Sequence, residues 1–93
     1  MIKSAAQPAL SILVVDDNAV HRRMSQTILT TAGYGVRLAE GGPQALASFE
    51  KAPADIVILD VHMPGMDGFE VCRRLRALPE GRRVPVLFLT DLS

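Results

Sequence analysis

The sequence has little of several features that would set a chain apart from ordinary globular proteins. It contains one cysteine, Cys72, and no tryptophan, and only 4% of its residues are aromatic. A single cysteine excludes an internal disulfide and fits a reducing compartment. No apolar run approaches the roughly 20 residues that a membrane-spanning helix needs, and residues 1–10 lack the apolar core of a signal peptide. We therefore expect a cytoplasmic protein without a membrane partner.

An excess of charge of either sign is also absent. Ten Lys and Arg residues balance ten Asp and Glu residues, so the formal net charge is zero. Net charge therefore favours neither nucleic acid nor an anionic membrane as an obligatory partner, and we expect no direct nucleic-acid contact. Five of the ten basic residues fall within residues 73–83, which we interpret as a solvated helix end and loop, with a docking patch as the alternative.

What is present is the composition of one soluble domain. The 93 residues are 48% hydrophobic and 22% charged, which is typical of a globular chain. We expect a flexible leader over residues 1–9 and a domain over residues 10–93. Four apolar runs predict strands at residues 11–15, 35–39, 55–59 and 84–89. The first, third and fourth are apolar throughout, as in strands that are covered on both faces.

Capping and turn residues mark three helices between these strands. Residues 16–18, Asp-Asp-Asn, can cap the first helix, which Gly33 ends. Pro43 lies in the first turn of the second helix, and Asp67 can cap a third that stops before Pro79. The apolar residues at helical spacing are Val20, Met24, Ile28 and Ala32, then Leu46 and Phe49, then Phe69, Cys72 and Leu75. Alternating strands and helices predict an α/β fold with a parallel sheet and right-handed crossovers.

Polar residues follow three of the predicted strands where each strand ends. They are Asp16 and Asp17, then Asp60, then Thr90 and Asp91. In an open parallel sheet, ligands bind at the carboxyl ends of the strands, so we expect these side chains to converge. Like charges at close range raise each other's pKa unless a cation compensates, and Mg²⁺ is the cation that bridges carboxylates to a phosphoryl group. A carboxylate beside such an ion can attack phosphorus to form an acyl phosphate.

Each feature also has an ordinary structural explanation when it is taken alone. Asp-Asp-Asn after a strand is most often a helix cap, and the residues 63–68, MPGMDG, form a turn. We expect His21 and His62 to be surface imidazoles, since neither lies at ligand spacing from a second His or Cys, and Cys72 to be a core residue. A dinucleotide-binding domain is excluded because no Gly-rich turn follows the first strand. The joint occurrence of the acidic pair, Asp60 and Thr90 favours the functional interpretation.

These residues resemble the receiver domain of two-component response regulators. The resemblance lies in the acidic pair of VVDDN, in Asp60 within DVHMPGMDG, in Thr90 at the end of the fourth strand, and in the spacing between them. It implies a flavodoxin-like, doubly wound sheet in the order 2-1-3-4. It also implies a cytoplasmic phosphoprotein that takes a phosphoryl group from a sensor histidine kinase or a histidine phosphotransfer protein. Such a domain is not an enzyme in the usual sense, although it catalyses its own phosphotransfer and dephosphorylation.

The resemblance also assigns a role to each site residue. Asp60 resembles the phosphoacceptor, and Asp16 and Asp17 resemble the acidic pair that holds Mg²⁺, Asp17 directly and Asp16 through water. The backbone carbonyl of His62 falls where the family supplies a further ligand. Thr90 matches the switch hydroxyl, which moves toward the phosphoryl group and changes the output face.

Two departures from the family pattern leave an alternative open. Asp91 follows Thr90 where receivers usually carry a small residue, and the final helix, strand and helix of a complete receiver, with their Lys, would lie beyond Ser93. We therefore expect a partial receiver domain over residues 10–93, with an output domain farther along the chain. An uncovered apolar fourth strand is an association hazard, so self-association through it is a second expectation. The alternative function is a receiver-like interaction module that works independently of phosphorylation.

Overall fold

The computed structural model describes residues 9–90, and within them the expected alternation of strands and helices is present. The elements are β1 (Ser11–Val15), α1 (Ala19–Thr31), β2 (Gly35–Ala39), α2 (Gly42–Lys51), β3 (Ile56–Asp60), α3 (Gly68–Arg76), a 3₁₀ turn (Pro79–Gly81) and β4 (Val86–Leu89). Most of the leader expected over residues 1–9 lies outside the described residues, as does Asp91. No helix of the described part is long and apolar enough to cross a membrane.

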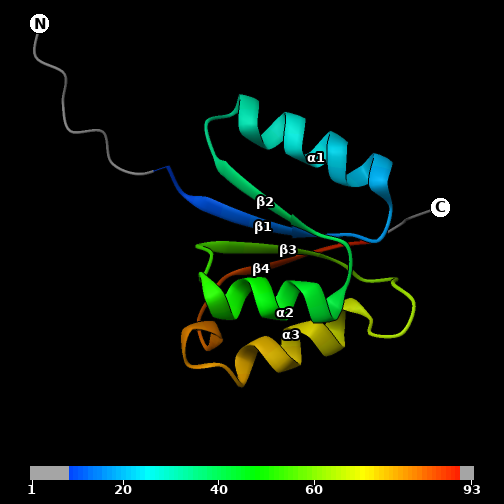
Figure 1. Ribbon diagram of the computed structural model, residues 1–93, viewed down its shortest axis with the longest axis vertical. Coiled ribbons are helices and arrows are strands. Elements are labelled where there is room, and N and C mark those ends of the chain that lie inside the picture. The colour runs from blue at the N-terminus through cyan, green and yellow to red at the C-terminus, as the bar shows by residue number, and fades with distance from the viewer. Residues whose placement is uncertain (1–8, 91–93) are drawn as a thin grey trace, which may run out of the picture.

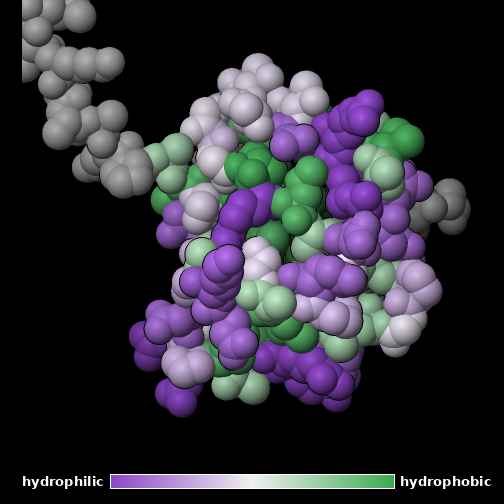
Figure 2. Space-filling view, in the orientation of Figure 1, coloured by the Kyte–Doolittle hydropathy of each residue, from purple (hydrophilic) through white to green (hydrophobic). Residues whose placement is uncertain are grey.

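The four strands form one parallel sheet in the order β2-β1-β3-β4, as the resemblance implied. Figure 1 shows α1 on one face of the sheet and α2 with α3 on the other. The main core lies on the α2 and α3 side, where Phe49 and Leu75 pack against Leu13 and Leu59. All four side chains are fully buried. Val14, on the other face of β1, is fully buried as well, so β1 is covered on both faces, as its continuous apolar run predicts. Polar side chains cover most of the face in Figure 2, with apolar patches between them.

The element boundaries differ from the predicted ones by one or two residues at functionally relevant points. β3 runs one residue later than predicted and includes Asp60 as its last residue. The reason is pairing, since Asp60 lies opposite Leu89 of β4 and the N–H of Val61 donates to the Leu89 carbonyl at 3.0 Å. β4 begins at Val86 rather than at Val84. The shift places the Asp60 carboxylate on the sheet rather than in the loop beyond it.

Apolar side chains at helical spacing are exposed in two of the helices. Val20, Met24 and Ile28 recur on one face of α1, yet they are 66%, 55% and 63% exposed. The residues of α1, all of which lie in the described part, include none that is fully buried. In α3, Phe69 is exposed and packs beside Phe88 of β4, with 5.0 Å between the ring centroids. Cys72 is half-buried and packs against the core, as predicted.

The outer strand β4 is thinly covered. Leu87, Phe88 and Leu89 are all exposed. Leu87 and Leu89 lie on the α1 face of the sheet, where α1 covers β2 and β1 instead, and Phe88 lies on the other face beside Phe69. Within the described residues, β4 pairs with β3 on one side and carries no strand on its other edge. This agrees with the expectation of an uncovered fourth strand.

Candidate functional site

The carboxyl ends of β1 and β3 bring three carboxylates together. Asp16 and Asp17 directly follow β1, and Asp60 ends β3. The two strands are paired, with Val15 opposite Leu59, so Asp16 and Asp60 hold the next position on neighbouring strands. One carboxylate oxygen from each of the three aspartates lies within 4.8 Å of the other two. The predicted convergence of the acidic residues is therefore present.

Asp16 is the most firmly held of the three. It is only 3% exposed, and its N–H donates to the carbonyl of Ala39 at 3.1 Å. Its Oδ1 accepts from the N–H of Asn18 at 2.9 Å, and its Oδ2 lies 3.5 Å from Nδ1 of His21. Asn18 in turn caps α1, because its side-chain oxygen accepts from the N–H of His21 at 3.0 Å. The predicted helix cap and the acidic site are thus parts of one loop.

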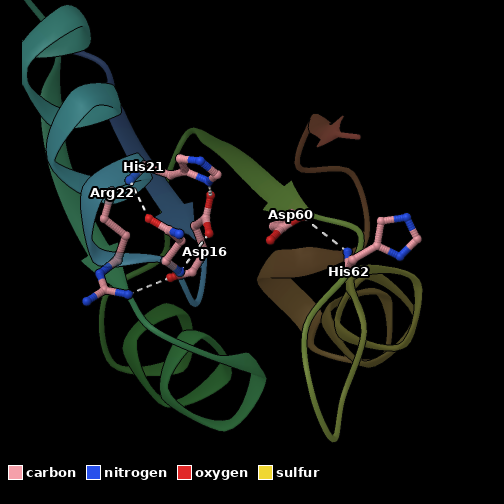
Figure 3. A network of polar contacts seen from close by, with 6 residues as sticks. Asp16, His21, Arg22, Asp60 and His62 are labelled. Carbon is pink, nitrogen blue, oxygen red and sulfur yellow. Dashed lines mark hydrogen bonds and ion pairs between the residues drawn. The ribbon is translucent and has the colours of Figure 1, made fainter. Parts of the chain in front are cut away.

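Asp60 lies where its negative charge is disfavoured. Burial raises the pKa of Asp60 above its ordinary value of 3.8, and the negative charges of Asp16 and Asp17 raise it further. The backbone N–H of His62 donates to Oδ1 of Asp60 at 3.1 Å (Figure 3) and opposes part of this rise in pKa. A carboxylate with a raised pKa beside two others gains from any cation placed among them.

The turn after Asp60 brings the chain back against the same strand end. Gly65 has a φ of +83°, a conformation that glycine adopts readily. The N–H of Gly68 donates to the carbonyl of Val61 at 3.0 Å. A Cβ at Gly68 would collide with the Asp60 carbonyl oxygen, so α3 begins closer to the Asp60 backbone than another residue would allow. Asp67 caps α3 as predicted, accepting from the N–H of Glu70 at 2.9 Å.

An open cavity of about 720 Å³ lies over the three carboxylates. Met24, Ile28 and Leu89 form an apolar wall, and Thr90, which is exposed and follows β4, lines the same cavity as Asp60. The remaining lining residues are Asn18, His21, Ser25 and His62. The cavity is therefore lined by three carboxylates and by the hydroxyls of Ser25 and Thr90.

The donor set fits a small, hard divalent cation. Three carboxylates supply oxygen ligands, and the open cavity leaves room for water or a further oxygen ligand at the same ion. After burial, the negative charges of Asp16 and Asp17 also raise the pKa of Asp60, and these charges favour a cation among the three carboxylates. Cysteine and a second histidine at ligand spacing, which would favour zinc, are absent from the described cluster.

Comparison with known proteins decides the family. A family model for the response regulator receiver domain matches residues 12–93. The chain belongs to this family. Its receiver fold, the 2-1-3-4 strand order and the acidic cavity at the strand ends agree with that membership.

Curated receiver-containing proteins are similar over most of this chain. The response regulator PleD of Caulobacter vibrioides is 48% identical over 82 residues, which are 88% of this chain and 18% of PleD. The transcriptional regulatory protein ResD of Bacillus subtilis is 43% identical over 79 residues, which are 85% of this chain and 32% of ResD. The chain thus spans less than a third of the length of either relative.

Solved receiver structures match the fold closely. The chemotaxis protein CheY4 of Vibrio cholerae superposes with a TM-score of 0.88 and 39% identity, over 91% of this chain and 71% of that one. The receiver domain of the sensor histidine kinase PA1611 from Pseudomonas aeruginosa superposes with a TM-score of 0.86 and 37% identity, over 90% of this chain and 69% of that one. That structure is described with a magnesium ion coordinated in its active site cleft.

One contact of this receiver site was not anticipated from the sequence. The guanidinium of Arg22 donates through Nη1 to the backbone carbonyl of Asp16 at 2.8 Å (Figure 3). The sequence did mark Arg22 as a residue that needs a partner. It is the fourth residue of α1, and the helix dipole disfavours a cation near a helix N-terminus. Nothing in the periodicity, however, indicates which way so long a side chain turns.

Proposed function

We propose that this receiver domain accepts a phosphoryl group on Asp60, in a reaction that depends on Mg²⁺. The observation that carries the proposal is the position of Asp60. Its half-buried carboxylate faces the open cavity, within 4.8 Å of two further carboxylates. Its pKa is raised by burial first and by its acidic neighbours after that, so a cation that neutralises them also prepares Asp60 to react as the anion.

The proposed metal ligands are those that the family resemblance implies, and the approach of the three carboxylates supports them. Asp17 is exposed and we assign it as a direct ligand, whereas the buried Asp16 acts through a water molecule. Asp60 and the backbone carbonyl of His62 complete the protein's share of the coordination. Mg²⁺ held by these residues would supply the positive charge that offsets the carboxylates and the charge of the transferred group.

The transfer itself needs one bond to form and one to break. An Asp60 carboxylate oxygen attacks phosphorus, and the bond from phosphorus to the donor breaks, with a phosphohistidine nitrogen leaving in the physiological reaction. Thr90 lines the same cavity and donates its hydroxyl hydrogen to a phosphoryl oxygen. Loss of the phosphoryl group to water reverses the change, and the domain's own residues assist both steps.

The proposed partners are those that membership of the receiver family implies. The donor is a sensor histidine kinase or a histidine phosphotransfer protein in the cytoplasm, and an output domain reports the phosphorylated state. The similarity to PleD and ResD, both much longer proteins, supports such an output. The exposed Leu87, Phe88 and Leu89 of β4 support self-association through that strand.

Intact-mass measurement after incubation with a small acyl phosphate tests the proposal. With Mg²⁺ present, we expect the protein to gain the mass of one phosphoryl group. EDTA and Asp60→Asn should each abolish the gain. Asp67→Asn is the matched control, because asparagine also caps a helix and Asp67 lies outside the acidic cluster.

Two results would contradict the proposal. A full phosphoryl gain in Asp60→Asn would move the acceptor to another residue. No gain in the unaltered chain with Mg²⁺ would favour the interaction module that works independently of phosphorylation.

A further inference from the structure

Arg22 is an unusual residue for its position in α1. It lies near the helix N-terminus, where the helix dipole disfavours a cation, and the acidic residues at this end, Asp16 and Asp17, precede the helix rather than lie in its first turn. Its side chain is half-buried and turns back to the loop before the helix. The neighbouring Arg23 is exposed and lines a shallow apolar groove on the outer face of α1. Two adjacent arginines of equal charge therefore have different surroundings.

Arg22 contacts the peptide group between the two acidic residues of the loop. The Asp16 carbonyl that accepts from Arg22 at 2.8 Å belongs to the peptide that joins Asp16 to Asp17. Holding that oxygen orients the planar peptide and thereby restricts the directions in which the Asp17 side chain can leave the backbone. The Asp16 N–H and carboxylate are already held by Ala39 and Asn18. The hydrogen bond from Arg22 holds the remaining backbone group of Asp16, its carbonyl, which is bonded to the nitrogen of Asp17.

We propose that Arg22 is a positioning residue for the cation site, which orients Asp17 through the Asp16 carbonyl. The inference rests on the proposed Mg²⁺ site. Hydrogen bonds behind metal ligands are ordinarily needed to hold them in place, and Asp17 is the ligand with the greatest freedom because it is exposed.

The two effects of removing Arg22 have opposite signs, which makes the proposal testable. By charge alone, the loss of a cation bonded to the loop that carries Asp16 and Asp17 strengthens Mg²⁺ binding. By positioning, the loss of the Asp16 hydrogen bond weakens it, by about tenfold for a residue of this kind. We expect the positioning effect to prevail, because the half-buried guanidinium bonds to a backbone carbonyl rather than to a carboxylate, so its charge acts on the bound cation only over a distance.

The experiment is a Mg²⁺ titration of the 93-residue protein, followed by backbone amide NMR shifts without any phosphoryl donor. We expect Arg22→Gln to bind Mg²⁺ about tenfold more weakly than the unaltered protein. Arg23→Gln removes the same charge one residue away, and we expect it to bind equally or slightly more tightly. Binding by Arg22→Gln as tight as that by Arg23→Gln would overturn the proposal.

A second variant guards against a fold defect. Arg22→Lys keeps the charge and one donor, so we expect it to recover part of the affinity that Arg22→Gln loses. A pure charge effect predicts the reverse order, and that order would refute the role. If the unaltered protein bound no Mg²⁺, the proposed metal site would itself be wrong and the role of Arg22 with it. Normal binding by the unaltered protein and by Arg22→Gln refutes the positioning role alone.

Discussion

Replacing Asp60 with asparagine should stabilise the metal-free protein, although it removes the proposed acceptor. Three carboxylates have oxygens within 4.8 Å of one another. At that separation a pair of like charges repels by about 1 kcal/mol in water and by about 3.5 kcal/mol at an effective dielectric of 20. Asparagine still accepts the hydrogen bond that the His62 N–H donates to Oδ1, so the substitution removes charge and little else.

The gain in unfolding free energy should be near the lower value, about 1 kcal/mol, for each of the two neighbouring carboxylates, Asp16 and Asp17. Asp17 is exposed, and solvent screens charges at the surface. We therefore expect Asp60→Asn to raise the unfolding free energy at pH 7 by about 1–2 kcal/mol in low salt, with a smaller gain in high salt. Urea unfolding in EDTA measures this, and Asp67→Asn, outside the cluster, provides the matched control.

The pH dependence of the gain has a definite sign. The pKa of Asp60 is raised above 3.8 in the folded protein, by burial first and by Asp16 and Asp17 next. Between 3.8 and the raised pKa, the folded protein therefore binds more protons than the unfolded chain, so its stability falls as pH rises through that window. The advantage of Asp60→Asn should grow over the same window and then level off. A less stable Asp60→Asn protein, or an equal gain in Asp67→Asn, would refute the reasoning.

Two further perturbations probe the same site. Mg²⁺ at about a hundred times its dissociation constant should raise the unfolding free energy of the unaltered protein by about 2.7 kcal/mol. Thermal unfolding of the unaltered protein and of Asp60→Asn measures this, and we expect the increase in the unaltered protein alone. Gly68→Ala should lower the unfolding free energy by about 1–3 kcal/mol in urea unfolding, because the new Cβ meets the Asp60 carbonyl. Gly35→Ala is its control, since a Cβ there lies 3.8 Å from the Leu10 carbonyl oxygen, an ordinary contact. Equal losses in the two glycine variants would contradict the close approach at Gly68.

The sheet and the acidic cluster could be predicted from local patterns. Continuous apolar runs identify strands covered on both faces, and strand ends in a parallel sheet meet at one edge. The approach of Asp16, Asp17 and Asp60 therefore follows once the strands are paired, and the structure shows all three together. The strand order came from the family resemblance, because no local pattern states which strands are neighbours.

Features that depend on neighbouring elements were harder to predict. The repeat of Val20, Met24 and Ile28 identifies a helix correctly, yet it lies on the exposed face of α1, because orientation depends on what packs against the helix. Phe69 has helical spacing but lies at the edge, beside Phe88. The reach of Arg22 to the Asp16 carbonyl depends on a long side chain and on the path of a loop, and neither appears in the periodicity.

The central claim is that Asp60 takes the phosphoryl group, and chemical trapping tests it most directly. Borohydride reduces an aspartyl phosphate to homoserine, so treatment of the protein after incubation with Mg²⁺ and a small acyl phosphate marks the acceptor. Peptide mass mapping then locates the change. The account predicts homoserine at position 60, with Asp16, Asp17 and Asp67 unchanged, and none when EDTA replaces Mg²⁺. Homoserine at another aspartate, or an unmodified Asp60 in a protein that has gained phosphoryl mass, would contradict it.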